Sequence, residues 1–125
     1  MNHASAPCPF CSLDAVVMRN ELAYARFDTA PVNRGHLLLI PLRHEPDFFA
    51  TTSAERAALL DLLERAKLLL DREFKPDGYN IGVNVGAAAG QTIGHVHVHL
   101  IPRYRGDMED PCGGVRGVIP AKQNY

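Results

Sequence analysis

Three histidines alternate with three aliphatic residues over residues 95–100, which read His-Val-His-Val-His-Leu. Because residues two positions apart on a β-strand point to the same face, this stretch predicts an imidazole face and an apolar face. The apolar face belongs against the core, so the imidazoles meet solvent, a metal or a ligand. Neighbouring side chains on one face are about 6–7 Å apart, whereas zinc–nitrogen bonds are about 2.0–2.1 Å long. One metal bound by all three histidines would therefore be strained.

Two other interpretations remain: incidental histidines on a half-exposed strand, or one structural and two chemical histidines. The preceding residues favour the second. A loop of small residues, Gly86–Gly90, leads into Gln91 and Thr92, and Asn84 lies just before it. Backbone N–H groups of such loops hold phosphate oxygens, and an imidazole can be a nucleophile or a general base near neutral pH. The region therefore suits a phosphate that gains negative charge during a reaction.

The chain around this motif predicts an α+β domain. One long helix is expected over residues 52–74, with a capping box between Thr52 and Glu55 and leucines at helical spacing. The loops inside the first and last strand pairs are too short for crossover helices, which favours antiparallel pairing. Five segments are expected to be strands: residues 16–19, 22–28, 36–40, 79–85 and 93–101.

Length and charge restrict the function classes. The 125 residues fit a single domain over 1–125, with a disordered segment expected at 1–7 and a tail of little regular structure at 103–125. A formal net charge of -1 argues against a nucleic-acid partner or an acidic membrane surface. No apolar run reaches the roughly 18–20 residues of a membrane span, and no signal peptide is visible. We therefore expect a cytoplasmic protein with no membrane partner.

The pair Cys8-x-x-Cys11 has the spacing of half a tetrahedral zinc site. Candidates for the other half are His44 and His95, and such a closed site would be structural. Free thiols are an alternative interpretation. A redox pair is another, although it normally opens a helix after a strand, and no such strand precedes Cys8. The odd, low number of cysteines suggests a reducing compartment.

A family resemblance adds to these patterns. Residues 91–101 resemble the signature of the histidine triad (HIT) family, which comprises nucleotide hydrolases and transferases, and the resemblance extends over residues 8–120. Pro102-Arg103 makes the chain most similar to the prokaryotic HIT hydrolases and the fragile histidine triad branch. The resemblance implies a HIT-like α+β fold: a five-stranded antiparallel sheet with one long helix and a short one, extended across a homodimer. It also implies zinc on the four candidate ligands, as in some HIT proteins.

The resemblance also implies residue roles. His97 would be the nucleophile that attacks the α-phosphate, and His99 would donate to a phosphate oxygen or the bridging oxygen. His36 would lie behind the nucleophile and support it, and Asp28 would bind the ribose hydroxyls. The implied catalytic residues are His97, His99, His36 and Thr92. The implied substrate-binding residues are Asp28, Asn84, Gly90, Gln91, Thr92 and His99.

These roles imply an enzyme that cleaves nucleotides at the α-phosphate through a nucleotidyl-histidine intermediate and releases a nucleoside monophosphate. Implied substrates are dinucleoside polyphosphates, such as diadenosine tri- or tetraphosphate, or nucleoside phosphoramidates such as AMP-amidate. One alternative is a nucleotidyltransferase or phosphorylase that uses phosphate as the acceptor. A nucleotide-binding regulatory protein with weak turnover and a purely structural zinc protein are others. The last leaves His97 and His99 unexplained.

Two further features each allow more than one interpretation. The residues Phe10, Leu13, Phe27 and Leu39 form either an apolar slot for a nucleobase or part of the core. The Gly-rich stretch at 111–120 either closes over the substrate or reaches a second subunit, or it is a plain surface tail.

Overall fold

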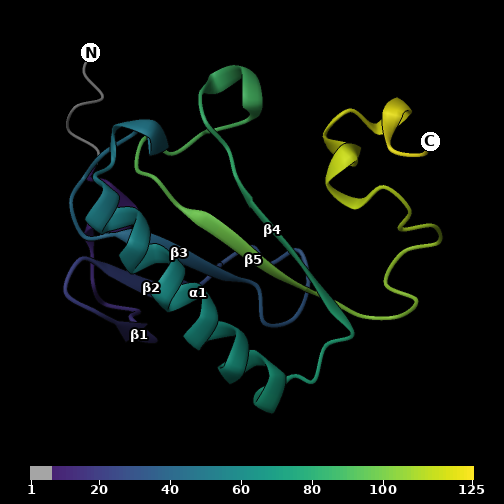
Figure 1. The fold of residues 1–125 in the computed structure, drawn as a ribbon, viewed down its shortest axis with the longest axis horizontal. Helices are drawn as coiled ribbons and strands as arrows, with labels where there is room; N and C mark the ends of the chain where they lie inside the picture. Colours follow the sequence, from purple (N-terminus) through teal and green to yellow (C-terminus); the bar gives the residue numbers. More distant parts are fainter. Residues whose placement is uncertain (1–6) are drawn as a thin grey trace.

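The computed structural model describes residues 7–125. Its centre is a five-stranded sheet in which every pair of neighbouring strands is antiparallel, in the order β1-β2-β3-β5-β4. Figure 1 shows the sheet with the long helix crossing it. The expected α+β class and antiparallel pairing are confirmed. The strands are β1 (Met18–Arg19), β2 (Ala23–Phe27), β3 (Leu37–Pro41), β4 (Gly78–Val83) and β5 (Val98–Arg103).

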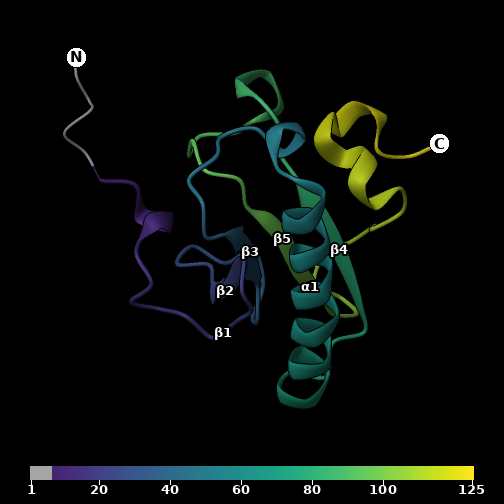
Figure 2. The same ribbon diagram turned by 60° about the vertical axis from the view of Figure 1, so that its left-hand side comes forward.

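The helix α1 (Ser53–Glu73) covers one face of the sheet, and the two views in Figures 1 and 2 agree on this placement. It begins at the expected capping box, because the Thr52 hydroxyl accepts from the Glu55 N–H while the Glu55 carboxylate accepts from the Thr52 N–H. The apolar face of the helix packs against alternate residues of β2 and β3 and against β5. The main core consists of Ala23, Ala25, Leu37, Leu39, Leu59, Leu62, Ala66, Leu70 and Leu100.

The opposite face of the sheet carries a smaller apolar cluster of Phe10, Tyr24, Leu38 and Ile40. Strand alternation separates the two faces, since Leu37 and Leu39 point to the helix and Leu38 points away. The short 3-10 helix η2 (Pro9–Cys11) lies over this second face. The Tyr24 hydroxyl holds it there by donating to the Phe10 carbonyl at 2.6 Å. This face is therefore free of the long helix.

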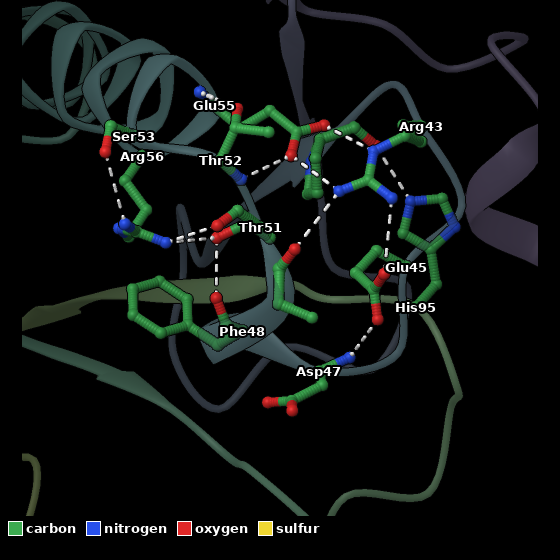
Figure 3. A network of polar contacts seen from close by, with 12 residues as sticks. Arg43, Glu45, Asp47, Phe48, Thr51, Thr52, Ser53, Glu55, Arg56 and His95 are labelled. Carbon is green, nitrogen blue, oxygen red and sulfur yellow. Dashed lines mark hydrogen bonds and ion pairs between the residues drawn. The ribbon is translucent and has the colours of Figure 1, made fainter.

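A bidentate ion pair joins the segment after β3 to the start of α1 (Figure 3). The Arg43 guanidinium donates to both carboxylate oxygens of Glu55, at 2.8 and 2.9 Å. Hydrogen bonds from Arg43 lower the pKa of the buried Glu55 carboxyl to about 2. Glu55, the N3 residue of the capping box, therefore also anchors the chain just before His44.

The last strand is shorter than the predicted 93–101, because β5 begins only at Val98. The backbone before it leaves the sheet: the Val96 N–H donates to the Glu45 carbonyl at 2.8 Å instead of to a strand neighbour. His95 and His97 therefore lie ahead of the strand, with His95 in a bend, and of the three histidines only His99 is within β5.

The other boundaries differ less. The strand expected at 16–19 shortens to β1, and the remaining strands and the helix shift by one or two residues at their ends. Within 7–125 the short helices are all of the 3-10 type: η2, η3 (Phe48–Ala50), η4 (Ala87–Ala89), η5 (Gly114–Val118) and η6 (Pro120–Lys122). The expected tail thus contains two short helices. The expectation of disorder at residues 1–6 lies outside the described residues.

None of the helices in the described part of the chain is both long and apolar enough to cross a membrane.

Candidate functional site

A cavity of about 290 Å³ opens on the sheet face that faces away from α1. Its wall combines the end of β2, the loop between β4 and β5, and the histidine segment. The sequence-predicted residues that line it are Asp28, Asn84, Gly90, Thr92, His97 and His99. We call this cavity the histidine pocket.

The His97 ring is oriented by the backbone of its own segment. Its Nδ1 lies 2.9 Å from the His95 carbonyl oxygen, and because a carbonyl can only accept, Nδ1 carries the proton. The other nitrogen, Nε2, therefore keeps its lone pair. The ring also packs edge-on against Phe10, with the ring centroids 4.9 Å apart. His97 Nε2 is thus held in a fixed orientation.

A second chain of contacts sets the proton on His99. The Val32 N–H donates to His36 Nδ1 at 3.0 Å, so the neutral His36 carries its proton on Nε2. That Nε2 lies 2.9 Å from His99 Nδ1 and donates to it. His99 must then carry its own proton on Nε2, as a hydrogen-bond donor. Burial is the main cause that lowers the pKa of both histidines, which keeps them neutral.

His36 therefore contacts His99 rather than His97, so the support that the family resemblance implies for His97 would pass through His99. Asp28 lies beside this pair, with its Oδ2 3.6 Å from His36 Nε2. Ligand atoms of these three residues lie within 4.8 Å of one another, close enough for a metal ion. A metal on His36 Nε2 would need the proton on Nδ1, where it would face the Val32 N–H. The geometry favours a hydrogen-bonded chain over a metal site.

The loop between β4 and β5 is shaped by two glycines in left-handed conformations, Gly86 at φ 91° and Gly90 at φ 95°. Gln91 braces this loop: its side-chain oxygen accepts from the Gly86 N–H, and its amide donates to the Pro46 and Ile93 carbonyls. Gln91 does not line the pocket. Its expected phosphate contact gives way to this bracing role because both ends of its amide are engaged.

Arg26 is a pocket residue that the sequence analysis missed. It is the only Lys or Arg among the described residues that line the pocket. Its guanidinium donates to the Pro9 carbonyl at 3.2 Å and stacks over the Phe10 ring at 5.6 Å. Strand alternation was the available signal, since Tyr24 and Arg26 share one face of β2 and Asp28 follows the strand in the same alternation.

The proposed apolar slot is only partly formed. Phe10 lines the histidine pocket, but Leu39 lies in the core beneath α1 and Phe27 packs against Phe74. Leu13 is exposed. Strand parity explains the difference, because Leu38 rather than Leu39 points to the pocket face.

The four predicted metal ligands come together beside the pocket. Ligand atoms of Cys8, Cys11, His44 and His95 all lie within 4.8 Å of one another. Cys8 Sγ is 3.4 Å from His95 Nδ1, and Cys11 Sγ is 3.3 Å from His44 Nδ1. Sulfur and nitrogen ligands of one tetrahedral zinc are about 3.5 Å apart, given the usual bond lengths. The residues therefore fit a tetrahedral metal ion.

His95 is prepared for this role by its other nitrogen. Nε2 lies 2.8 Å from the Pro41 carbonyl, so it carries the proton, and Nδ1 keeps a lone pair for the metal. Burial lowers the pKa of His95, which favours the neutral form that binds metals. The side chain of His95 thus belongs to the candidate metal-binding cluster, while its carbonyl orients His97.

A family model described as the HIT domain matches residues 12–106 of the chain. The chain belongs to the HIT family. Within this HIT protein the match covers the whole sheet, the long helix and the histidine segment.

Three relatives illustrate the similarity. A protein named AP-4-A phosphorylase from Mycobacterium tuberculosis (strain CDC 1551 / Oshkosh) is 37% identical over 93 residues, 74% of this chain and 48% of that protein. One named bis(5'-nucleosyl)-tetraphosphatase [asymmetrical], from Schizosaccharomyces pombe, is 35% identical over 76% of this chain and 52% of that protein. The chain thus spans about half of each. A Zn-bound histidine triad protein from Mycobacterium smegmatis has a TM-score of 0.72 at 33% identity, covering 82% of this chain and 77% of that one.

The hydrogen-bond chain predicts the position of each ring proton. Nitrogen–proton correlation spectra near neutral pH should show the proton on Nδ1 for His97 and on Nε2 for His36 and His99. As the pH falls through 6.5, the ordinary pKa of histidine, His36 and His99 should stay neutral because their pKa values are lowered. A charged His36 near neutral pH, or one protonated on Nδ1, would contradict the assignment.

Proposed function

We propose that this HIT protein hydrolyses nucleotides at the α-phosphate, with His97 as the nucleophile. One observation carries the proposal: His97 Nε2 has a free lone pair, set by the His95 carbonyl, in a pocket that it shares with the N–H donor of His99. Binding alone requires no such nucleophile. The arrangement matches the two-step logic of covalent catalysis, in which one hard displacement becomes two easier ones.

In the first step His97 Nε2 forms a bond to the α-phosphorus, and the bond from phosphorus to the leaving oxygen or nitrogen breaks. His99 Nε2–H donates to the leaving atom. The positive charge that develops on His97 is stabilised through its Nδ1–H bond to the His95 carbonyl. In the second step water attacks phosphorus and releases a proton to the solvent. The nitrogen–phosphorus bond breaks, which returns His97 to its neutral form, and a nucleoside monophosphate leaves.

The loop supplies the phosphate contacts. Asn84 and Thr92 offer an amide and a hydroxyl, and the backbone at Gly90 can approach the equatorial oxygens closely. Asp28 stands at the edge of the pocket, where it would accept from ribose hydroxyls. Its other oxygen already accepts from the Ala30 N–H at 2.9 Å, which fixes the carboxylate.

The names of the relatives support dinucleoside polyphosphates as substrates, with nucleoside phosphoramidates as the other class that this chemistry accommodates. One relative is named as a tetraphosphatase and another as a phosphorylase. The phosphorylase relative is 37% identical, which makes transfer to inorganic phosphate the second candidate reaction. Both reactions share the first step and differ only in whether water or phosphate resolves the intermediate.

The His97→Ala variant tests the mechanism. We expect kcat on diadenosine tetraphosphate and on adenosine phosphoramidate to fall at least about 10³-fold, with partial recovery in added imidazole, because only the nucleophile is removed. Circular dichroism should show an unchanged fold. AMP as a product of the wild-type protein indicates hydrolysis, whereas ADP formed only with added phosphate indicates a phosphorylase. Substantial turnover by folded His97→Ala would refute the nucleophile.

We also propose that the metal held by the Cys8, Cys11, His44 and His95 cluster is zinc. The donor set of two sulfurs and two imidazole nitrogens is typical of closed structural zinc sites, and one structural neighbour is a Zn-bound HIT protein. The ion would tie η2 to the segment after β3, with no step of the reaction passing through it. Cys8, Cys11 and Cys112 form no disulfide, which suits a reducing compartment such as the cytoplasm.

The zinc proposal predicts a difference between two cysteine variants. Protein purified without chelator should contain one zinc per chain by elemental analysis. Cys11→Ser should lose most of the zinc and melt at a lower temperature, since the ligand set is broken. Cys112→Ser, at an exposed cysteine outside the cluster, should keep the zinc content and the melting temperature of the wild-type protein. Equal zinc content in the two variants would contradict the assignment.

We further propose that two copies pair through β4 and α1. β4 is the last strand of the sheet order, so its outer edge is unpaired within the chain. An adjoining groove of about 480 Å³ is lined by apolar residues of α1 and the sheet, among them Leu60 and Ile81, which are 59% and 49% exposed. A second copy would cover both features and extend the sheet.

Sedimentation velocity with two leucine variants tests this pairing. Wild-type protein should sediment as twice the 13.7 kDa chain. Leu60→Arg should dissociate it, because the charge enters the groove, whereas Leu68→Arg, at an equally exposed leucine of α1 outside the groove, should not. A wild-type monomer, or identical behaviour of both variants, would disprove the interface.

A further inference from the structure

A second cavity, of about 450 Å³, adjoins the histidine pocket. Both cavities are lined by Asp28, Asn84 and His99, whereas His97 lines only the histidine pocket. We call the second cavity the tail lobe. His99 therefore lies at the junction of the two cavities, and His97, the proposed nucleophile, lies on the side of the histidine pocket.

The floor of the tail lobe is the sheet beside His99. His99 is paired with Gly82 of β4, and a Cβ atom at Gly82 would meet nothing within 4 Å. A side chain at this position would fill part of the lobe, which glycine leaves open. The floor is completed by His36, Asn80 and Ile101.

The outer wall comes from the C-terminal tail, which folds beside β4 in both views (Figures 1 and 2). Val115 and Val118 of η5 line the lobe, yet they are 60% and 78% exposed. Apolar side chains exposed next to a reaction centre indicate a binding surface.

This wall is braced from within the tail. The Gln123 side-chain amide donates to the carbonyls of Asp110 and Cys112. Gly113 is packed so tightly against this turn that a Cβ there would lie 1.8 Å from the Gln123 carbonyl oxygen. The tail therefore holds Val115 and Val118 in place through its own contacts.

We propose that the tail lobe binds the leaving-group nucleoside of a dinucleoside polyphosphate. This inference rests on the proposed function. Attack by His97 on phosphorus expels the leaving group roughly in line, away from the nucleophile. His99, the donor to the leaving atom, lines the tail lobe as well as the histidine pocket. The departing half of the substrate thus has a cavity directly beyond its proton donor.

The lining of the lobe suits a nucleoside rather than a bare phosphate. No Lys or Arg is among the described residues that line it, and Asp28 supplies its only formal charge, since His36 and His99 are neutral. Valines and isoleucines with a few amide groups match the mostly apolar, sparsely polar surfaces that bind small organic molecules. The cavity volume also lies within the range of such sites.

Two adjacent residues of the tail provide a matched test. Val118 lines the lobe, whereas Ile119 is 59% exposed and does not. Each would be changed to Asp, which adds the same charge one residue apart. The two substrates are diadenosine tetraphosphate, with a nucleotide leaving group, and adenosine phosphoramidate, whose leaving group is ammonia. Only the first substrate reaches into the lobe.

We expect Val118→Asp to raise KM for diadenosine tetraphosphate about tenfold while kcat/KM for adenosine phosphoramidate changes less than about twofold. Ile119→Asp should leave both substrates unchanged. Equal losses on both substrates, or no loss on either, would overturn the assignment of the lobe. An equal effect of Ile119→Asp would show that the charge acts from the surface and would overturn it too.

A binding measurement separates this inference from the proposed function. If the wild-type protein cleaves neither substrate, the proposed hydrolysis fails, and calorimetry still tests the lobe. Val118→Asp should then weaken binding of diadenosine tetraphosphate and leave the affinity for AMP unchanged. Equal weakening of both ligands, or none, would refute the lobe independently of catalysis.

Discussion

The rest of the site depends on the contacts that the buried residue His95 makes. One ring nitrogen donates to the Pro41 carbonyl, and the other faces Cys8 and Cys11. The carbonyl of the same residue accepts from His97. A single buried residue therefore joins the end of β3, the N-terminal turn and the orientation of the proposed nucleophile. Because both ring nitrogens are engaged, the ring has little freedom to rotate, and the His95 backbone that orients His97 is held with it.

The site works through the placement of protons more than through charge. Burial favours neutral imidazoles at His36 and His99, and backbone groups at Val32 and His95 decide which nitrogens carry protons. One histidine is thereby left with a lone pair and its neighbour with a donor. The net charge is -1 and the pocket holds one arginine, so the phosphate of the proposed substrate would be held mainly by backbone and amide dipoles. Such dipoles are fixed before the substrate arrives, which is how an enzyme stabilises charge that develops during a reaction.

Much of this arrangement could be predicted from local patterns. The alternation of histidines separated the imidazole face from the apolar face, and Thr52 with Glu55 marked the start of the helix. The spacing of Cys8 and Cys11 pointed to half of a metal site, and chemical preference pointed to His44 and His95 for the remainder. Each of these signals depends on side-chain type or on residues a few positions apart. Strand parity would also have placed Arg26 in the pocket and excluded Leu39, had it been applied to β2 and β3.

Tertiary structure decided three features: the start of β5 only at Val98, the bracing role of Gln91 and the packing of the tail. Val96 gives its N–H to Glu45, and Gln91 donates to Pro46, so partners far away in the sequence override the local strand pattern. The sequence by itself determined which residue types face one another, and it pointed to the histidines, the cysteines and a small-residue loop as the candidates for the chemistry. Only the fold decided which nitrogen of each histidine holds a proton, because that choice depends on partners such as Pro41 and His36, which lie 54 and 63 residues from His95 and His99.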